Sequence, residues 1–377
     1  MFESIQESFQ SLFHSKPEVV VRAPGRVNLI GEHTDYNDGF VLPMAIDRSV
    51  WIALRPRSDR RVLVHSLDFN VRGEFDLDRL ERGLGWLEYL KGVANELQIA
   101  GYPLHGWEGV MSADVPRDAG LSSSAAVEMA TARAFSALSG FALDAMRMAA
   151  VGQRAASEWV GVRGGIMDEA VSAAAKAGHA FFLDCRTLVY EHIPVPKDAA
   201  VVIMDTSTRR GLVDSAYNKR RQECEAAARF FGVQALRDVS LEMLGTTGIG
   251  LDKVALQRAR HVVTENERVL RAVQAMRAGD TSALGGLFNA SHASLRDDFE
   301  VTNDALNWIV EIAQAQPECY GARMTGAGFG GCAVALVRQD STQEFEAAVR
   351  AGYKRKSGMD AVVYVCRASD GATSIKL

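Results

Sequence analysis

A dense polar segment at residues 24–35 is the first candidate for chemistry in this chain. An arginine, an asparagine, a glutamate, a histidine and an aspartate fall there between two glycines and a short apolar run. Glu32, His33 and Asp35 offer hydrogen-bonding groups of several kinds, which suits a ligand with many hydroxyls, such as a sugar. The alternative interpretation is a polar loop before a strand, and the segment alone does not decide between them.

A second segment, residues 116–126, has the composition of a phosphate-binding loop. Small residues run straight into a helical pattern, and the first N–H groups of a helix have no intrahelical partner. The helix dipole adds partial positive charge there, and small side chains let a phosphate approach. Three consecutive serines add donors and a possible Mg²⁺ ligand, while the alternative is a serine N-cap. The loop is not a Walker A motif, because no Gly-Lys-Ser/Thr follows.

A carboxylate at Asp168, directly after the sequence Gly164-Gly165-Ile166-Met167, is a candidate catalytic group. A phosphoryl-transfer enzyme must position two substrates, neutralise charge, and orient or deprotonate the attacking hydroxyl. Asp168 is suited to accept that proton, and Arg26 is suited to stabilise both Asp168 and the transferring phosphoryl group. The alternative is an ordinary acidic residue at the start of a helix.

A third glycine-rich segment, residues 325–332, satisfies the pattern G-x-G-x-x-G. A dinucleotide site requires a strand before that pattern and a helix after it. Here an expected helix at 303–315 comes well before and an apolar strand at 332–337 comes after, so the context is reversed. The loop is instead expected to pack against a neighbouring active site, or to be a tight turn that needs positive φ.

The elements that must position these segments mix strands and helices without a regular alternation, which predicts two α+β domains. We place the boundary near residue 190, giving an N-terminal domain over 1–190 and a C-terminal domain over 191–377. Apolar spacing predicts a short amphipathic helix at the N-terminus. Strands are expected at 19–22, 40–46, 50–54, 62–66, 70–75, 107–112, 180–184, 201–205, 332–337 and 361–366, and helices at 84–98, 122–138, 143–158, 214–231, 252–278, 281–293, 303–315 and 343–353.

Composition narrows the function classes. The 377 residues are 47% hydrophobic and 24% charged, with a formal net charge of -5, so the basic footprint of a nucleic-acid-binding protein is missing. No apolar run approaches the roughly 20 residues that cross a membrane, and the first residues lack the pattern of a signal peptide. The five cysteines are scattered without a CxxC pair, which favours a reducing, cytoplasmic compartment over a zinc site.

Together and in this order, the three motifs resemble those of the GHMP small-molecule kinases, and among them those of the galactokinases. The resemblance covers nearly the whole chain. Residues 26–36 match the galactokinase signature, residues 120–126 match the ATP loop of the family, and residues 325–332 match its third motif. Further matches are residues 165–168, 184–186, 217–218, 220–221, 260–267 and 291–298.

The resemblance implies a two-domain GHMP kinase fold with the active site in the cleft between the domains. It implies phosphorylation of the anomeric C1 hydroxyl of α-D-galactose by ATP with Mg²⁺, giving galactose 1-phosphate and ADP, in a cytoplasmic monomer or weak homo-oligomer. Asp168 would be the proton acceptor, with Arg26 beside it. The other implied roles are sugar binding by Glu32, His33, Asp35, Gly165, Asp168 and Tyr217, phosphate binding by Gly120, Leu121, Ser122, Ser123 and Ser124, and Mg²⁺ binding by Ser124 and Glu158.

Three positions depart from the family pattern. Ala156 stands where galactokinases usually carry a Mg²⁺-binding glutamate, and Glu158 can replace it only if the helix ends there, which Gly161 allows. Asp118 replaces a glycine of the ATP loop, and Glu169 replaces a glutamine. Two alternatives therefore stay open: a kinase for a related sugar, such as N-acetylgalactosamine or a uronic acid, and a galactokinase-like sugar sensor with weak turnover.

Overall fold

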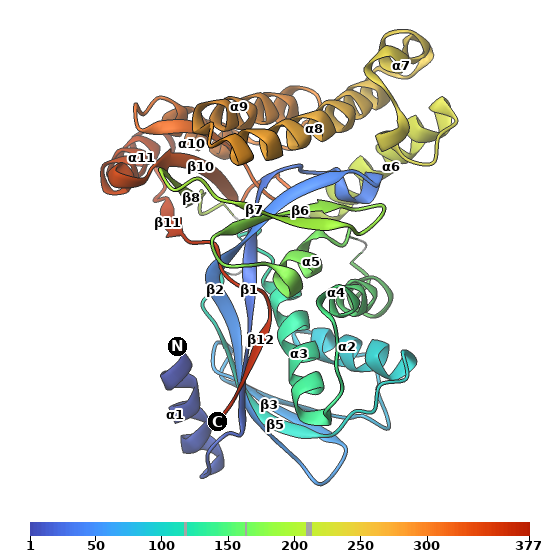
Figure 1. Cartoon of the computed structure of the whole chain (residues 1–377), viewed down its shortest axis with the longest axis vertical. Coiled ribbons are helices and arrows are strands. Elements are labelled where there is room, and N and C mark those ends of the chain that lie inside the picture. Colours follow the sequence, from blue (N-terminus) through green and yellow to red (C-terminus); the bar gives the residue numbers. More distant parts are fainter. Residues whose placement is uncertain (117–118, 163, 209–212) are drawn as a thin grey trace.

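The computed structural model describes residues 1–116, 119–162, 164–208 and 213–377 of the chain. Within these residues the strands form two sheets, one of eight strands and one of four, and helices pack on both (Figure 1). This is the mixed α+β architecture that the order of elements predicts. Among the described helices, none is both long enough and apolar enough to cross a membrane.

Two long antiparallel strands form the centre of the larger sheet. β1 (Val19–Ile30) and β2 (Phe40–Pro56) pair along their length, with shifts of register after Pro24 and after Asn28. The polar segment is thus a strand as far as Ile30, well beyond the strand expected at 19–22. The other strands of this sheet are β3 (Arg61–Ser66), β4 (Val71–Asp76), β5 (Trp107–Ala113), β6 (His179–Asp184), β7 (Tyr190–Pro194) and β12 (Thr373–Lys376).

Alternation along β1 assigns its side chains to two faces, because successive residues of a strand point in opposite directions. Val19 and Val21 pack in the core beneath four helices, whereas Val20 packs with Ile5 and Phe9 of the N-terminal helix on the opposite face. The four helices lie together on one side in Figure 1, and the N-terminal helix lies on the other. The four are α2 (Leu87–Ile99), α3 (Ser123–Ser139), α4 (Ala145–Arg154) and α5 (Met167–Ala174), and the N-terminal one is α1 (Phe2–Phe13).

The smaller sheet is antiparallel throughout, and the side chains of its strands also alternate between two faces that helices cover. Its order is β11 (Val362–Cys366), β8 (Ala199–Asp205), β10 (Cys332–Arg338) and β9 (Cys319–Met324). Along β8, Val202 packs against α10 (Asp304–Gln314) and α11 (Thr342–Ser357) on one face. Val201 and Ile203 pack against α8 (Lys253–Ala278) and α9 (Thr281–Asp297) on the other.

One apolar cluster joins the two sheets. Val27 and Leu29 of β1 pack in it with Val334 of β10 and Phe288 of α9. The end of the chain also returns to the larger sheet, where β12 pairs with β1. The boundary near residue 190 stays a prediction, since β7 ends at Pro194 in the larger sheet and β8 begins at Ala199 in the smaller one.

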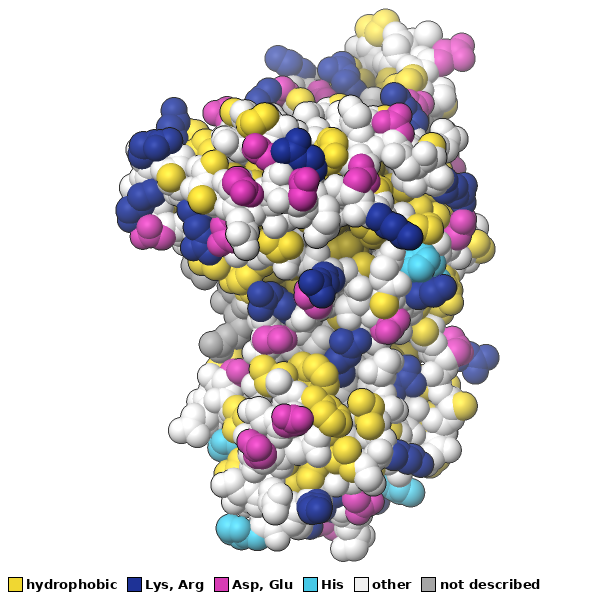
Figure 2. Space-filling model, turned by 60° about the vertical axis from the view of Figure 1, so that its left-hand side comes forward, with side chains coloured by type: hydrophobic (Ala, Val, Ile, Leu, Met, Phe, Trp, Pro, Cys, Tyr) yellow, Lys and Arg dark blue, Asp and Glu magenta, His cyan; other side chains and the backbone are white. Residues whose placement is uncertain are grey.

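Several elements differ from the expected ones in extent. The helix expected at 143–158 is α-helical only to Arg154, and a π-helical turn follows over Ala155–Val160. Strands β7, β9 and β12 were not expected at all. Helix α6 (Val213–Phe231) agrees with the helix expected at 214–231. It is followed by the short helix α7 (Leu241–Gly245), which was not expected and lies at the far end of the molecule in Figure 1. On the face shown in Figure 2, basic and acidic side chains are interspersed, in keeping with the small net charge.

Candidate active site

A cavity of about 430 Å³ brings the three motifs together. Its volume is within the usual range for small-molecule sites. The polar segment, the serine loop, the start of α5 and the third glycine loop each contribute to its wall. The sequence-predicted residues that line it are Arg26, Glu32, His33, Asp35, Gly120, Leu121, Ser122, Ser123, Ser124, Gly165, Asp168 and Tyr217.

Asp168 and Arg26 form the polar centre of the cavity. Arg26 donates from Nε to Oδ1 of Asp168 at 2.7 Å and from Nη2 to Oδ2 at 2.9 Å, and its Nη1 donates to the carbonyl of Gly120 at 2.5 Å. The guanidinium is buried, while the Asp168 side chain keeps 31% of its surface exposed. Asp168 lies in the first turn of α5. It is therefore an acidic residue at the start of a helix, and this position is compatible with a catalytic role.

The serine loop is joined to the same carboxylate. Ser122 stands before the first residue of α3 with φ of 56° and makes no cap with its side chain. Its hydroxyl instead donates to Oδ2 of Asp168. Ser123 and Ser124 follow as the first two residues of the helix, and both line the cavity. The first N–H groups of a helix have no intrahelical partner there. The departure at Asp118 lies outside the described residues.

Asp35 lies behind Asp168 and is held by a close backbone approach. A Cβ at Gly165 would lie 2.1 Å from Oδ2 of Asp35, so no larger residue fits there without moving the carboxylate. Burial, together with the negative charge of Asp168, raises the pKa of Asp35 to about 6. Gly165 thus acts on the site through its lack of a side chain.

Three aromatic rings lie around His33, which lines the cavity. His33 has φ of 63°, and its ring lies 4.6 Å from the ring of Phe299 and 5.7 Å from that of Tyr217. Nδ1 of His33 is 2.9 Å from the hydroxyl of Tyr36, whereas Nε2 makes no hydrogen bond within the described part of the chain. Burial and the neighbouring His261 lower the pKa of His33 well below its usual value, so the ring is neutral.

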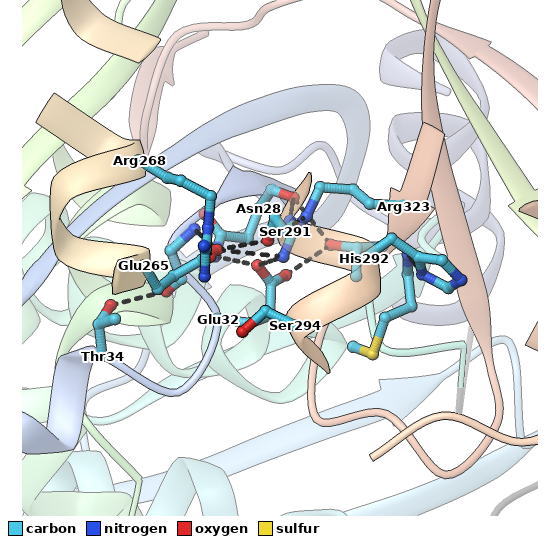
Figure 3. A network of polar contacts seen from close by, with 12 residues as sticks. Asn28, Glu32, Thr34, Glu265, Arg268, Ser291, His292, Ser294 and Arg323 are labelled. Carbon is cyan, nitrogen blue, oxygen red and sulfur yellow. Dashed lines mark hydrogen bonds and ion pairs between the residues drawn. The ribbon is translucent and has the colours of Figure 1, made fainter. Parts of the chain in front are cut away.

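Glu32 is the hub of a buried polar network (Figure 3). Its Oε1 accepts from the backbone N–H of Gly326 at 2.9 Å and from the Thr325 hydroxyl at 3.1 Å. Its Oε2 accepts from Asn28 at 2.9 Å and forms an ion pair with Nη2 of Arg323 at 2.5 Å. The carboxylate therefore ties the polar segment to the third glycine loop, which confirms that this loop packs against the site.

The same network continues into helices α8 and α9. Glu265 accepts from Arg268 at 2.6 Å, from the Ser291 hydroxyl at 2.6 Å and from the backbone N–H of Gly31 at 3.0 Å. Burial alone would raise the pKa of Glu265, but Arg268 and the other cations around it bring that pKa down to about 2. Sequence reasoning missed Glu265 and Arg323, because nothing in one sequence pairs residues so far apart.

The expected metal ligand Glu158 does not lie at the cavity. It is exposed on the π-helical turn, and its backbone carbonyl accepts from Arg82 at 2.6 Å. At this turn Ala156 lines the cavity instead. Two carboxylates that the sequence did not single out as ligands, Glu128 of α3 and Glu169 of α5, line the cavity near Ser124. Ser124 and Glu128 are four residues apart on one helix and so share a face. This spacing could have identified Glu128 as a residue near the expected Mg²⁺ ligand Ser124.

Three segments of the chain match models of known protein families. Residues 7–56 match the galactokinase galactose-binding signature. Residues 88–176 match the N-terminal domain of the GHMP kinases, and residues 272–355 match their C-terminal domain. The first match contains the polar segment, and the second contains the serine loop and Asp168.

Named relatives extend the similarity over the full chain. The chain is 47% identical to a galactokinase of Roseiflexus sp. (strain RS-1), over 97% of this chain and 95% of that one. It is 45% identical to a galactokinase of Chloroflexus aggregans, over 100% and 98% of the two chains. The structure of Lactococcus lactis galactokinase complexed with galactose superposes with a TM-score of 0.95, at 38% identity and 100% coverage of both chains.

Proposed function

The chain belongs to the galactokinases of the GHMP kinase family, and on that premise we propose that it transfers the γ-phosphoryl group of ATP to the anomeric hydroxyl of α-D-galactose. The products are galactose 1-phosphate and ADP. The observation that carries the proposal is the cavity in which Asp168, held by Arg26, lies between the sugar segment and the serine loop. That arrangement supports a role for Asp168 as the proton acceptor between the two substrates.

We propose that Asp168 accepts the proton of the anomeric hydroxyl as its oxygen attacks the phosphorus. Arg26 fixes both oxygens of that carboxylate and brings a buried positive charge to the point where phosphoryl charge develops. Ser122 donates to the same carboxylate, so a hydrogen bond joins the serine loop directly to the proposed base. Chemistry of this kind depends mainly on positioning and charge.

The sugar end combines fixed acceptors with an aromatic wall. Asp35 offers a carboxylate, Nε2 of His33 is a buried polar atom that a hydroxyl can satisfy, and Tyr217 stands beside His33. A sugar hydroxyl that reaches Glu32 meets a carboxylate already held by several protein donors. Such preorganisation lowers the cost of binding a flexible polyol.

ATP would place its phosphates at the N-terminus of α3, against residues 120–124. Mg²⁺ would neutralise phosphate charge there. The donor set fits a hard cation, since the exposed hydroxyl of Ser124 lies at the same cavity as carboxylate oxygens. We also propose a cytoplasmic location and a monomer or weak homo-oligomer. In support, all five cysteines are among the described residues and none of them forms a disulfide.

The test is ADP release from the purified chain with ATP, Mg²⁺ and a panel of sugars. We expect galactose to give the highest kcat/KM, with N-acetylgalactosamine and galacturonic acid far behind. Asp168→Asn keeps the shape of the side chain but removes the base, so kcat should fall by about a hundredfold or more while circular dichroism shows an intact fold. Galactose binding by calorimetry without ADP release would instead indicate a sugar sensor, and an unchanged rate in Asp168→Asn would remove this residue from the mechanism.

A further inference from the structure

Two buried carboxylates at the phosphate end of the cavity have no role in the mechanism above. Glu128 of α3 is 1% exposed and Glu169 of α5 is 6% exposed, yet both line the cavity. Oε1 of Glu128 and Oε2 of Glu169 make no hydrogen bond within the part of the chain that the structure describes. A buried polar atom without a partner is costly, so these oxygens call for a ligand.

The two side chains lie beside the same glycine of α4. A Cβ at Gly152 of α4 would lie 3.6 Å from Cβ of Glu128 and 3.2 Å from Cγ of Glu169, so the stems of both side chains lie beside this glycine. Glu128 follows Ser124 by four residues on α3, which places the two side chains on the same face of the helix. Ser124, Glu128 and Glu169 thus converge from two helices on one side of the cavity.

The charges around the pair favour a cation. Both carboxylates are buried, and Glu169 follows Asp168 directly in the first turn of α5. The one guanidinium in this part of the cavity wall, among the described residues, is Arg26, and it is already held by Asp168 and Gly120. The described cavity wall therefore offers this pair no unengaged guanidinium, and a cation that arrives with a substrate could supply the positive charge.

We propose that Glu128 and Glu169, with the hydroxyl of Ser124, bind the divalent cation that accompanies the nucleotide. The inference rests on the proposed kinase function. It gives these residues the Mg²⁺-binding role that the family resemblance implied for Glu158. Among the described residues no group of three or more His, Cys, Asp or Glu side chains could hold a metal ion, so the protein offers an incomplete shell. That suits Mg²⁺, which usually takes one or two carboxylates and fills its remaining positions with phosphate oxygens and water.

Mn²⁺ binding to the full chain tests the site without turnover. The free Mn²⁺ signal in electron paramagnetic resonance is measured with and without a non-hydrolysable ATP analogue, and without sugar. Losing even an indirect partner of a metal costs 10- to 100-fold in affinity, so Glu128→Gln and Glu169→Gln should each weaken Mn²⁺ binding by about tenfold or more. Glu344→Gln, the same change at an exposed site of α11, should match the wild type.

Galactose binding by calorimetry shows whether each variant is folded, because the sugar end of the cavity is untouched. If Glu128→Gln loses galactose binding too, the shorter Glu128→Asp takes its place in the Mn²⁺ measurement. Wild-type Mn²⁺ affinity in folded Glu128 and Glu169 variants would overturn the proposal, and so would weakened binding in Glu158→Gln. Failure of the kinase function would look different: Mn²⁺ and the analogue would bind normally, with no ADP released when sugar is added.

Discussion

At the scale of single residues, the cavity contains several carboxylates, and the groups around each carboxylate determine its ionisation. Arg26 pairs directly with Asp168, whereas at Asp35 burial and the charge of Asp168 raise the pKa by more than backbone hydrogen bonds and Arg26 lower it. The two aspartates therefore differ in character although they line the same cavity. Such separation of neighbouring acids by their surroundings is common where one must stay ionised for catalysis.

Galactose affinity should depend on the ionisation of Asp35. Its folded pKa of about 6 means that the carboxylate, the form that accepts from sugar hydroxyls, is depleted as pH falls through that value. If only the ionised form binds, the dissociation constant rises by about tenfold for each pH unit well below the pKa. Calorimetric titrations of galactose between about pH 5 and pH 8 measure this dependence.

Asp168→Asn provides the matched control for that titration. Removing the charge of Asp168 takes away one cause of the raised pKa of Asp35, so the midpoint of the pH dependence should move to lower pH. Affinity for the ATP analogue, measured across the same range, reports any general loss of structure. Galactose affinity that does not change with pH would show that Asp35 does not bind the sugar as a carboxylate.

At the scale of the elements, the sequence reveals what depends on local patterns. The helices with clear apolar periodicity lie within a few residues of their expected places, as α8 at Lys253–Ala278 does. β9 and β12 escaped prediction because neither alternates clearly: β9 contains Gly321 and Arg323, and all four residues of β12 are exposed. These segments become strands only through pairing with distant partners.

The same limit applies to the site. The sugar segment, the serine loop and Asp168 are visible as short motifs, and the structure brings them to one cavity. Glu265 lies in the matched segment 260–267, but its role and that of Arg323 could not be predicted, since these roles exist only after α8, β9 and β1 have packed together. The position of Glu158 was likewise hidden, because the π-helical turn over Ala155–Val160 changes which residues face the cavity.

Glu265→Gln should reveal how firmly α8 is tied to the sugar segment. The change leaves Arg268 and Arg323 short of an anion in a site where Glu265 and Arg323 are fully buried. Breaking a buried ion pair from one side costs about 3–5 kcal/mol, so the free energy of unfolding in denaturant should fall by that amount. KM for galactose should also rise, while KM for ATP changes little.

Glu346→Gln is the matched control for this variant. It removes the carboxylate of an exposed pair with Arg350 on α11, which should change the free energy of unfolding by less than about 1 kcal/mol. If Glu265→Gln were no more destabilising than this control, the network in Figure 3 would not be what holds Gly31 and Glu32 in place.

At the scale of the whole molecule, the two sheets share one apolar cluster and one returning strand. Val27 and Leu29 of β1 and Val334 of β10 lie in the same core, and β12 carries the end of the chain back to β1. The cavity depends on this joint, because its sugar segment belongs to the larger sheet and its third glycine loop connects β9 to β10. The shared core therefore holds the two halves of the site next to each other.

We therefore expect the two sheets to unfold together. Phe288 of α9 is fully buried in the shared cluster, so Phe288→Ala should lower the free energy of unfolding by about 3–5 kcal/mol. Circular dichroism and tryptophan fluorescence should follow one denaturant transition, in the wild type and in the variant. A Trp308→Phe background leaves the fluorescence of Trp51, Trp86, Trp107 and Trp159, which lie in the larger sheet or in the segments packed beside it, to report on that half of the molecule. If that signal kept its midpoint in Phe288→Ala while circular dichroism showed an earlier transition, the two halves would be independent and the shared core would not couple them.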